Sequence, residues 1–195
     1  ETIQYIKAKY PAVPVILDSK RADIGATSEM YAKEAFDRYG ADALTVNPYM
    51  GMDALKPFLD RADKGVVVLC RTSNPGAKEI QELKIDGEEL YKRVAKLISG
   101  SWNYNSNTLL VAGATCPEEL GEIRKIVGET PLLVPGVGAQ GGDVEKVLRF
   151  GKTADGTGLV INSSRAIIYA SKGADFAEAA RKATLDLRAQ INSFR

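Results

Sequence analysis

The chain has 195 residues, of which 45% are hydrophobic and 26% are charged, enough for one compact domain with a sizeable core. Its 26 basic and 25 acidic residues leave a formal charge of +1, and no run of Lys and Arg resembles a nucleic-acid-binding patch. The sequence contains no histidine, which excludes Ser-His-Asp and Cys-His catalysis, so proton transfer falls to Lys, Asp, Glu or Tyr.

The cysteine and hydropathy patterns bear on the compartment. Only Cys70 and Cys116 are present, so no disulfide framework is predicted and a reducing cytoplasm is expected. No apolar stretch reaches the roughly 20 residues of a membrane span, and no signal-peptide pattern opens the chain. The sequence therefore predicts a cytoplasmic protein that binds neither membrane nor nucleic acid.

Short β-branched runs alternate with amphipathic segments along the chain. Six strands are predicted, at residues 13–17, 43–46, 66–70, 108–112, 132–134 and 158–161. Helices are predicted at residues 28–39, 52–60, 87–99, 117–127, 143–150 and from 175 to about 191. Near-continuous apolar strands alternating with helices predict an α/β fold with a parallel sheet, either doubly wound or closed as a barrel.

Two observations favour the barrel. Polar or glycine-rich motifs follow nearly every predicted strand, and the chain starts in a helix-like segment, residues 1–9, with no strand before it. An eight-stranded TIM (β/α)8 barrel would need two further βα units upstream, roughly 60 to 80 residues. We therefore expect residues 1–195 to form a single, partial TIM-barrel domain with about six βα units and without the first two.

The most informative motif is Asp18-Ser19-Lys20-Arg21-Ala22-Asp23, which follows the first predicted strand. Because side chains in an extended strand alternate, Asp18 and Lys20 are expected to share one face. The alternative is a surface salt bridge worth about 0 to 1 kcal/mol. In α/β folds the carboxyl ends of strands carry the chemistry, which favours a proton-transfer site.

Two later strand ends are suited to phosphate. The turn from Pro135 to Asp143 is rich in glycine and opens a helix, where backbone N–H groups can approach an anion. Its alternative is a flexible loop in which Asp143 caps the helix. Arg165 follows the last predicted strand and offers bidentate donors, although alone it would be a surface helix residue.

The segment Thr72-Ser73-Asn74-Pro75-Gly76 supplies hydroxyl and amide groups after the third predicted strand. Such groups can hydrogen-bond the edge of a heterocycle, whereas the Asn-Pro-Gly sequence is also typical of a plain turn. Asn47-Pro48-Tyr49-Met50-Gly51 is interpreted as a turn.

Taken together and in order, these motifs resemble orotidine 5'-phosphate decarboxylase of the longer-chain bacterial branch. The resemblance spans essentially the whole chain and rests on residues 18–24 with Thr27, residues 72–76, residues 135–143 and residues 162–165. It implies a homodimeric TIM barrel that converts orotidine 5'-phosphate to UMP and CO2, in de novo pyrimidine synthesis, without metal or organic cofactor.

The resemblance also implies residue roles. Lys20 would stabilise and protonate the C6 carbanion, and Asp18 would lie near the substrate carboxylate. Asp23 and Thr27 would reach into the neighbouring subunit's site, and Ser73 would bond the pyrimidine ring. The phosphate would be held by the residues of the glycine-rich turn and the last strand end: Pro135, Gly136, Gln140, Gly141 and Arg165.

One departure from the family leaves alternatives open. The family's charge network begins with a further lysine on a strand upstream of Asp18, and this chain shows no such strand; Lys7 and Lys9 lie in a helix-like segment. A Mg2+-dependent sugar-phosphate lyase or decarboxylase of the same superfamily shares the Asp-x-Lys-x-x-Asp pattern. A non-catalytic nucleotide-binding fragment is the alternative from a different class.

Overall fold

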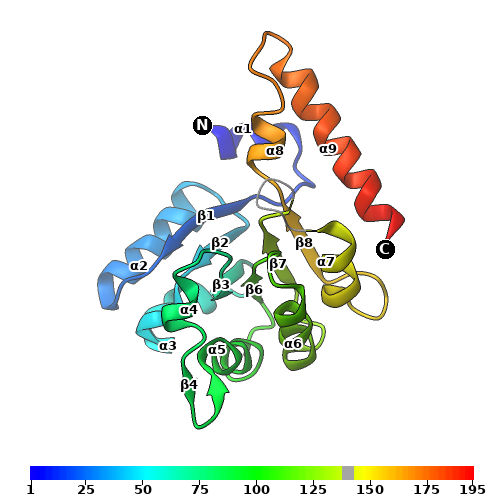
Figure 1. Ribbon diagram of the computed structural model, residues 1–195. Coiled ribbons are helices and arrows are strands. Elements are labelled where there is room, and N and C mark those ends of the chain that lie inside the picture. The colour runs from blue at the N-terminus through cyan, green and yellow to red at the C-terminus, as the bar shows by residue number, and fades with distance from the viewer. Residues whose placement is uncertain (138–142) are drawn as a thin grey trace. The chain divides into compact units, whose positions relative to one another are not determined.

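The computed structural model describes residues 1–137 and 143–195. The chain forms two compact units, one comprising Glu1–Cys70 with Lys84–Leu110 and the other Arg71–Leu83 with Val111–Arg195. Strands β3 (Gly65–Arg71) and β6 (Thr108–Ala112) each begin in the first unit and end in the second. Six strands follow one another in the sheet in the order β1-β2-β3-β6-β7-β8 (Figure 1).

The first unit contains the amino-terminal βα repeats. Besides β3 and the start of β6, its elements are α1 (Thr2–Lys9), β1 (Ile16–Arg21), α2 (Gly25–Lys33), the π-helix η1 (Glu34–Arg38), β2 (Ala43–Val46), the 3-10 helix η2 (Pro48–Met50), α3 (Met52–Leu59), β4 (Lys84–Ile85), β5 (Glu88–Glu89) and α5 (Leu90–Ser99). Strands β1, β2 and β3 pair in parallel, as the alternation of strands and helices predicts.

The core of the first unit comes from β2, β3 and the helices that cover them. All four residues of β2 are buried, as are Val66, Val67 and Val68 of β3. Phe58 of α3 is fully buried and meets Phe36 edge-on, with ring centroids 6.5 Å apart. Each such side chain contributes about 1.5–3 kcal/mol by leaving water, which fixes the strands that carry the polar motifs.

The first strand lies later in the sequence than predicted. The expected strand at residues 13–17 is wrong in its bounds, because β1 runs from Ile16 to Arg21 and Val13 is exposed. The Val15 N–H donates to the Asp42 carboxylate at 2.8 Å instead of to a neighbouring strand. The Asp18-x-Lys20 motif consequently lies inside the strand rather than after it.

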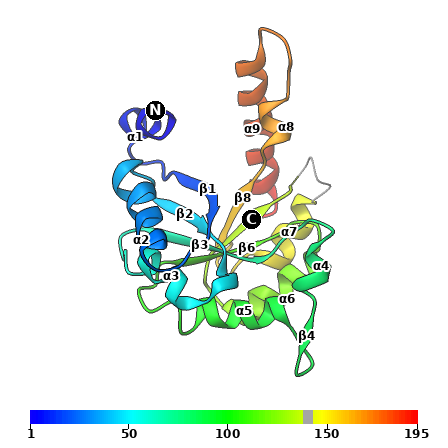
Figure 2. The ribbon, with the colours of Figure 1, turned by 90° about the vertical axis from the view of Figure 1, so that its left-hand side faces the viewer.

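The predicted helix at 87–99 is also corrected. Residues 84–89 form the antiparallel hairpin β4-β5, visible in Figure 2 as a projection next to the β4 label, and α5 begins only at Leu90. Asp86 and Gly87 both have positive φ, +53° and +84°, so they form the tight turn that Asp-Gly sequences favour.

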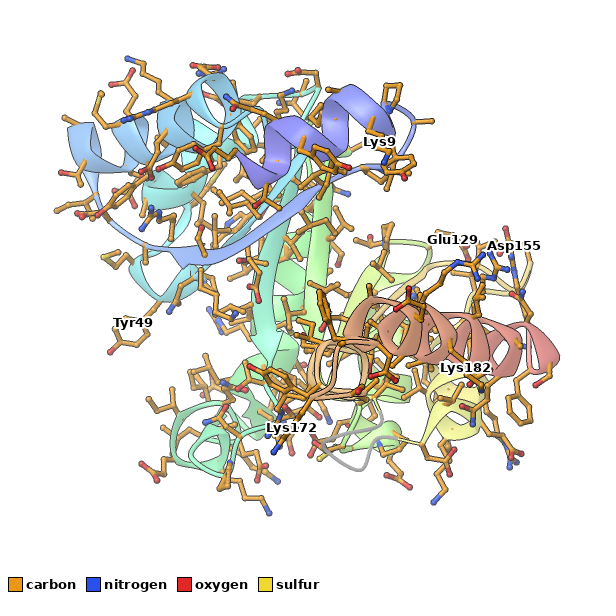
Figure 3. All side chains as sticks on the ribbon, turned by 90° about the horizontal axis from the view of Figure 1, so that it is seen from above. Lys9, Tyr49, Glu129, Asp155, Lys172 and Lys182 are labelled. Carbon is orange, nitrogen blue, oxygen red and sulfur yellow. The ribbon has the colours of Figure 1, made fainter. Side chains whose placement is uncertain are left out.

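The remaining predicted helices are present with small shifts. The helix expected at 28–39 starts at Gly25 and ends in the π-helical turn η1, and the turn expected at 47–51 is the short helix η2. Tyr49 of η2 is 82% exposed and projects outward (Figure 3).

The second unit contains the carboxy-terminal repeats. Its elements are α4 (Ala77–Ile80), the end of β6, α6 (Pro117–Val127), β7 (Leu132–Pro135), α7 (Val144–Gly151), β8 (Leu159–Asn162), α8 (Arg165–Ile168) and α9 (Phe176–Ser193). Strands β7 and β8 pair in parallel, in register from Leu132↔Leu159 to Pro135↔Asn162. Within residues 1–137 and 143–195, no helix combines the length and the apolar character needed to cross a bilayer.

Close helix packing organises this unit. Helix α7 buries Val144, Val147 and Leu148. It is capped by the preceding residue, Asp143, whose carboxylate accepts the backbone N–H groups of Glu145 and Lys146. A Cβ atom at Gly151 would lie 2.9 Å from Leu120 Cδ2 of α6, so a larger residue there would require the Leu120 side chain to shift.

Arg124 of α6 connects several chain segments of the second unit. Its guanidinium donates to the carbonyls of Gly128, Thr130, Gly151 and Gly158 over 2.5–2.8 Å. Burial lowers the pKa of Arg124, and the charge of Glu129 opposes this shift only in part.

Candidate active site

The Asp18 and Lys20 side chains meet at the end of β1. The Lys20 ammonium donates to Asp18 Oδ1 at 2.6 Å, and the two side chains are 51% and 60% exposed, respectively. An ion pair this exposed contributes only about 0 to 1 kcal/mol to stability. The pair therefore contributes little to stability, and its ammonium and carboxylate are both accessible to solvent.

The sequence predicted that regular strand alternation would bring Asp18 and Lys20 together. In the structure the strand is irregular at this point. Lys20 has φ +49°, in the left-handed region, and the register of β1 against β2 shifts between Leu17 and Arg21. A residue other than glycine in that region costs about 1–3 kcal/mol and persists only where the surroundings hold it. Such strained positions cluster at active sites.

A residue that sequence reasoning missed contacts this pair. Thr45 of β2 donates to Asp18 Oδ1 at 2.9 Å and accepts the Lys20 backbone N–H at 2.8 Å. Its only sequence signal is a hydroxyl in an otherwise apolar strand, Ala-Leu-Thr-Val. Because threonine is β-branched, it is also an ordinary strand residue.

Arg21 fixes the far end of β1. Its guanidinium donates to Glu34 at 2.6 Å and lies over the Tyr31 ring, 4.5 Å from the centroid. The Tyr39 hydroxyl first, and then Arg21, hold the pKa of Glu34 below its usual value against the opposing effect of burial. Arg21 thereby ties the motif to α2 and η1.

Asp23 and Thr27 lie beyond β1 in the same unit. The Asp23 carboxylate accepts the N–H of Ile24 at 2.8 Å, next to the start of α2. Thr27 lies in the first turn of α2 and is exposed.

Ser73 lies in the loop between β3 and α4, which is tightly held. Gln81 accepts the Thr72 N–H and donates to its hydroxyl, both at 2.8 Å. Gly113, at the end of β6, contacts Ser73 so closely that an added Cβ would lie 3.0–3.2 Å from its Cβ, N and Cα atoms. Gly113 and Gln81 were not foreseen in the sequence, because their partners are distant along the chain.

Arg71, at the end of β3, holds the same loop through hydrogen bonds and ion pairs. Its side chain is 5% exposed and donates to Glu119 at 2.5 Å, to Glu82 at 2.6 Å and to the Thr72 carbonyl at 2.8 Å. Burial alone would lower the pKa of Arg71, but the hydrogen bond and charge of Glu119 outweigh it and raise the pKa. The ion pairs keep the loop in place.

Three of the predicted phosphate-binding residues, Pro135, Gly136 and Arg165, lie at or shortly after the carboxyl ends of β7 and β8. Pro135 ends β7, and its carbonyl accepts the N–H of Ala114 at 3.0 Å. Gly136 follows with φ +94°, a conformation that glycine adopts without strain. Gln140 and Gly141 lie outside the described residues.

Arg165 begins α8 and is exposed. It follows Ser164, whose hydroxyl donates to Asn162 at 3.2 Å, and Asn162 pairs in register with Pro135. The β7-β8 pairing therefore brings the ends of both strands to one edge of the sheet within this unit.

Other features do not coincide with the predicted residues. A cavity of about 260 Å3 in the second unit is lined by Leu148, Gly156, Thr157, Gly158, Leu159, Ile161, Ile191, Asn192 and Arg195. These residues include the amino end of β8, whereas Arg165 follows its carboxyl end. In the part of the chain that the structure describes, no three His, Cys, Asp or Glu side chains gather as metal ligands.

Comparisons with known proteins identify the family. Residues 1–183 match the profile of the orotidine 5'-phosphate decarboxylase / HUMPS family. The whole chain is 60% identical to orotidine 5'-phosphate decarboxylase of Ralstonia pickettii (strain 12J) and spans 72% of that protein.

Two solved structures are similar over 98% of the chain. The OMP decarboxylase of Leishmania donovani has a TM-score of 0.86 at 40% identity, with 72% of its chain covered. The UMP synthase of the same organism has a TM-score of 0.87 at 42% identity, with 42% covered. These similarities confirm the predicted TIM-barrel fold class, and the chain belongs to the orotidine 5'-phosphate decarboxylase / HUMPS family.

Proposed function

We propose that this chain decarboxylates orotidine 5'-phosphate to UMP and CO2 in pyrimidine biosynthesis, with Lys20 as the group that acts on the reacting carbon. The reaction is that of a cofactor-independent carboxy-lyase, and family membership supports it. The role of Lys20 is supported by the short contact between its ammonium and Asp18 at the end of β1. That contact is the observation that carries the proposal.

The proposed reaction is a decarboxylation followed by a proton transfer to C6. The bond between C6 and the substrate carboxylate breaks, CO2 leaves, and the electron pair remains on C6. The Lys20 ammonium stabilises this carbanion and gives it a proton, which yields UMP; the amine then regains a proton from water. Asp18, hydrogen-bonded to the ammonium, lies beside the departing carboxylate and orients Lys20.

Further residues are proposed to bind the pyrimidine and the phosphate of the substrate. Ser73 hydrogen-bonds the pyrimidine, and its rigid loop supports that role because little rearrangement is needed on binding. Arg165 offers two parallel donors to the phosphate, joined by the turn at Pro135 and Gly136 and by the predicted residues Gln140 and Gly141. Binding energy from the phosphate can then lower the barrier at C6.

A homodimer is the proposed assembly, with Asp23 and Thr27 reaching the partner's site. Exposed apolar side chains near Thr27, Ile24 at 59% and Met30 at 58%, support a protein contact there. Sedimentation that gives a monomer at assay concentration would exclude this assembly. A cytoplasmic location also belongs to the proposal, in keeping with the expected reduced cysteines.

The test is replacement of Lys20 by alanine. The loss of ultraviolet absorbance of orotidine 5'-phosphate is followed in EDTA, and UMP binding is measured by calorimetry. We expect Lys20→Ala to abolish turnover while UMP binding stays measurable. The control is Lys182→Ala, since Lys182 is 77% exposed on α9 (Figure 3) and should leave both unchanged.

Two results would contradict the proposal. Full turnover by Lys20→Ala would remove Lys20 from the mechanism. Turnover of the unmodified protein that EDTA abolishes would indicate metal-dependent chemistry in place of the proposed reaction.

A further inference from the structure

The Thr45 hydroxyl closes a ring of hydrogen bonds with the motif that carries Lys20. The Lys20 backbone N–H donates to Thr45 Oγ1 at 2.8 Å, and Thr45 donates to Asp18 Oδ1 at 2.9 Å. The same Asp18 oxygen accepts the Lys20 ammonium at 2.6 Å. Main chain and side chain of one lysine are thus connected through a single hydroxyl and a single carboxylate.

The strand register explains why a hydroxyl is needed there. Leu17 pairs with Leu44 and Arg21 with Val46, so Asp18, Ser19 and Lys20 together lie opposite Thr45 alone. Three residues facing one cannot all find backbone partners in a parallel ladder. The Thr45 side chain supplies the acceptor that the ladder lacks at the Lys20 N–H.

The surroundings of Thr45 make this arrangement specific. Thr45 is fully buried, so its hydroxyl must find its partners within the protein. The Leu17 carbonyl lies 3.5 Å away, a weaker acceptor than the Asp18 carboxylate at 2.9 Å. Bulged strands next to active sites re-aim side chains, and this bulge holds Lys20 at positive φ.

We infer that Thr45 is a positioning residue for the decarboxylation, acting through Asp18 and Lys20 without touching the substrate. Its hydroxyl holds the left-handed backbone of Lys20 and fixes the carboxylate to which the ammonium is bound. This inference rests on the proposed role of Lys20. Thr45 differs from an ordinary core threonine because its hydroxyl, and not its methyl group, is the part needed for turnover.

Two substitutions separate these roles. Thr45→Val keeps the shape and removes the hydroxyl, whereas Thr45→Ser keeps the hydroxyl and removes the methyl group. The matched control is Thr108→Val, because Thr108 is a buried strand threonine of the same unit whose hydroxyl donates to a backbone carbonyl, that of Ile98, at 3.2 Å.

Each variant is measured for kcat, for UMP affinity, and for hydrogen exchange of the Lys20 amide by NMR. A misplacement of a reacting group by about 1 Å can lower the rate about a hundredfold. We expect Thr45→Val to displace Lys20 by less than this and to lower kcat at least about tenfold. UMP affinity should change by less than about twofold, because no phosphate or ring contact is removed. The Lys20 amide should exchange faster, and Thr45→Ser should restore both properties.

The outcomes are separable from those of the proposed function. An unchanged Lys20 exchange rate in Thr45→Val would overturn the inference, whatever the activity. Equal loss of kcat in Thr45→Val and Thr45→Ser would overturn it in favour of packing, as would equal loss in Thr108→Val. If the unmodified protein shows no turnover, the proposed function fails, and the inference falls with it even where the exchange data establish the hydrogen-bonded ring.

Discussion

Replacement of Arg124 by methionine should destabilise the second unit strongly. Methionine keeps much of the apolar stem but removes all four hydrogen bonds to carbonyls. Gly151 is a buried residue at the end of α7. Its carbonyl would be left without the guanidinium donor, and an unsatisfied buried group costs about 1–3 kcal/mol.

The other three carbonyls lose less. Gly158 keeps the N–H of Leu132 as a donor at 2.9 Å, and Gly128 is exposed, so water can replace the guanidinium there. Thr130 is half-buried, and its carbonyl loses one hydrogen bond from the guanidinium. Together with Gly151 these losses amount to about 3 kcal/mol, a large share of the roughly 5–15 kcal/mol by which domains are stable.

Urea unfolding followed by circular dichroism measures this loss. With a slope of about 2 kcal/mol per molar urea, the midpoint should fall by about 1.5 M. Arg124→Lys should fall between the wild type and Arg124→Met, because one ammonium cannot reproduce the planar fork of donors. If Arg124→Met differs from the exposed control Arg188→Met by less than about 0.5 kcal/mol, the guanidinium does not hold these segments together.

Two further predictions concern the loop of Ser73 and the start of β2. Gly113→Ala should push Ser73 by a few tenths of an ångström and weaken UMP binding about tenfold by calorimetry, with the fold retained; unchanged affinity would contradict this contact. Burial favours a higher pKa for Asp42, but hydrogen bonds from Lys7 and the Val15 N–H hold its pKa below the usual value. The stabilising effect of the Asp42 carboxylate should therefore be complete above about pH 4 and should vanish as the pH falls through its lowered pKa in the folded protein. The urea midpoints of wild type and Asp42→Asn should then converge in acid. A difference between the two midpoints that does not change with pH would refute the assignment.

Much of the fold could be predicted because apolar runs and turn residues are local signals. Strands 43–46 and 108–112 and the helix at 117–127 have the predicted bounds. The start of β1 could not be predicted in this way, because Val15 bonds the side chain of Asp42, a residue 27 positions away. The hairpin turn at Asp86-Gly87 did carry a local signal, which the helical spacing that follows it obscured.

In the candidate site, too, the features with a local sequence signal could be predicted, and those that depend on distant residues could not. The contact between Asp18 and Lys20 was anticipated from their spacing, but the bulge that produces it depends on pairing with β2. A lysine is not a residue type that predicts positive φ, and Thr45 has the β-branched shape of any strand residue. Gly113 likewise gained meaning only when the fold brought it against Ser73.

The bulge in β1 separates the residues proposed to act on the substrate from the residues that pair with β2. Leu17 and Arg21 are each in register with β2, so the pairing before and after the motif is fixed independently of residues 18–20. Exchange of side chains within that short segment can therefore alter the reaction without shifting the hydrophobic faces of the sheet.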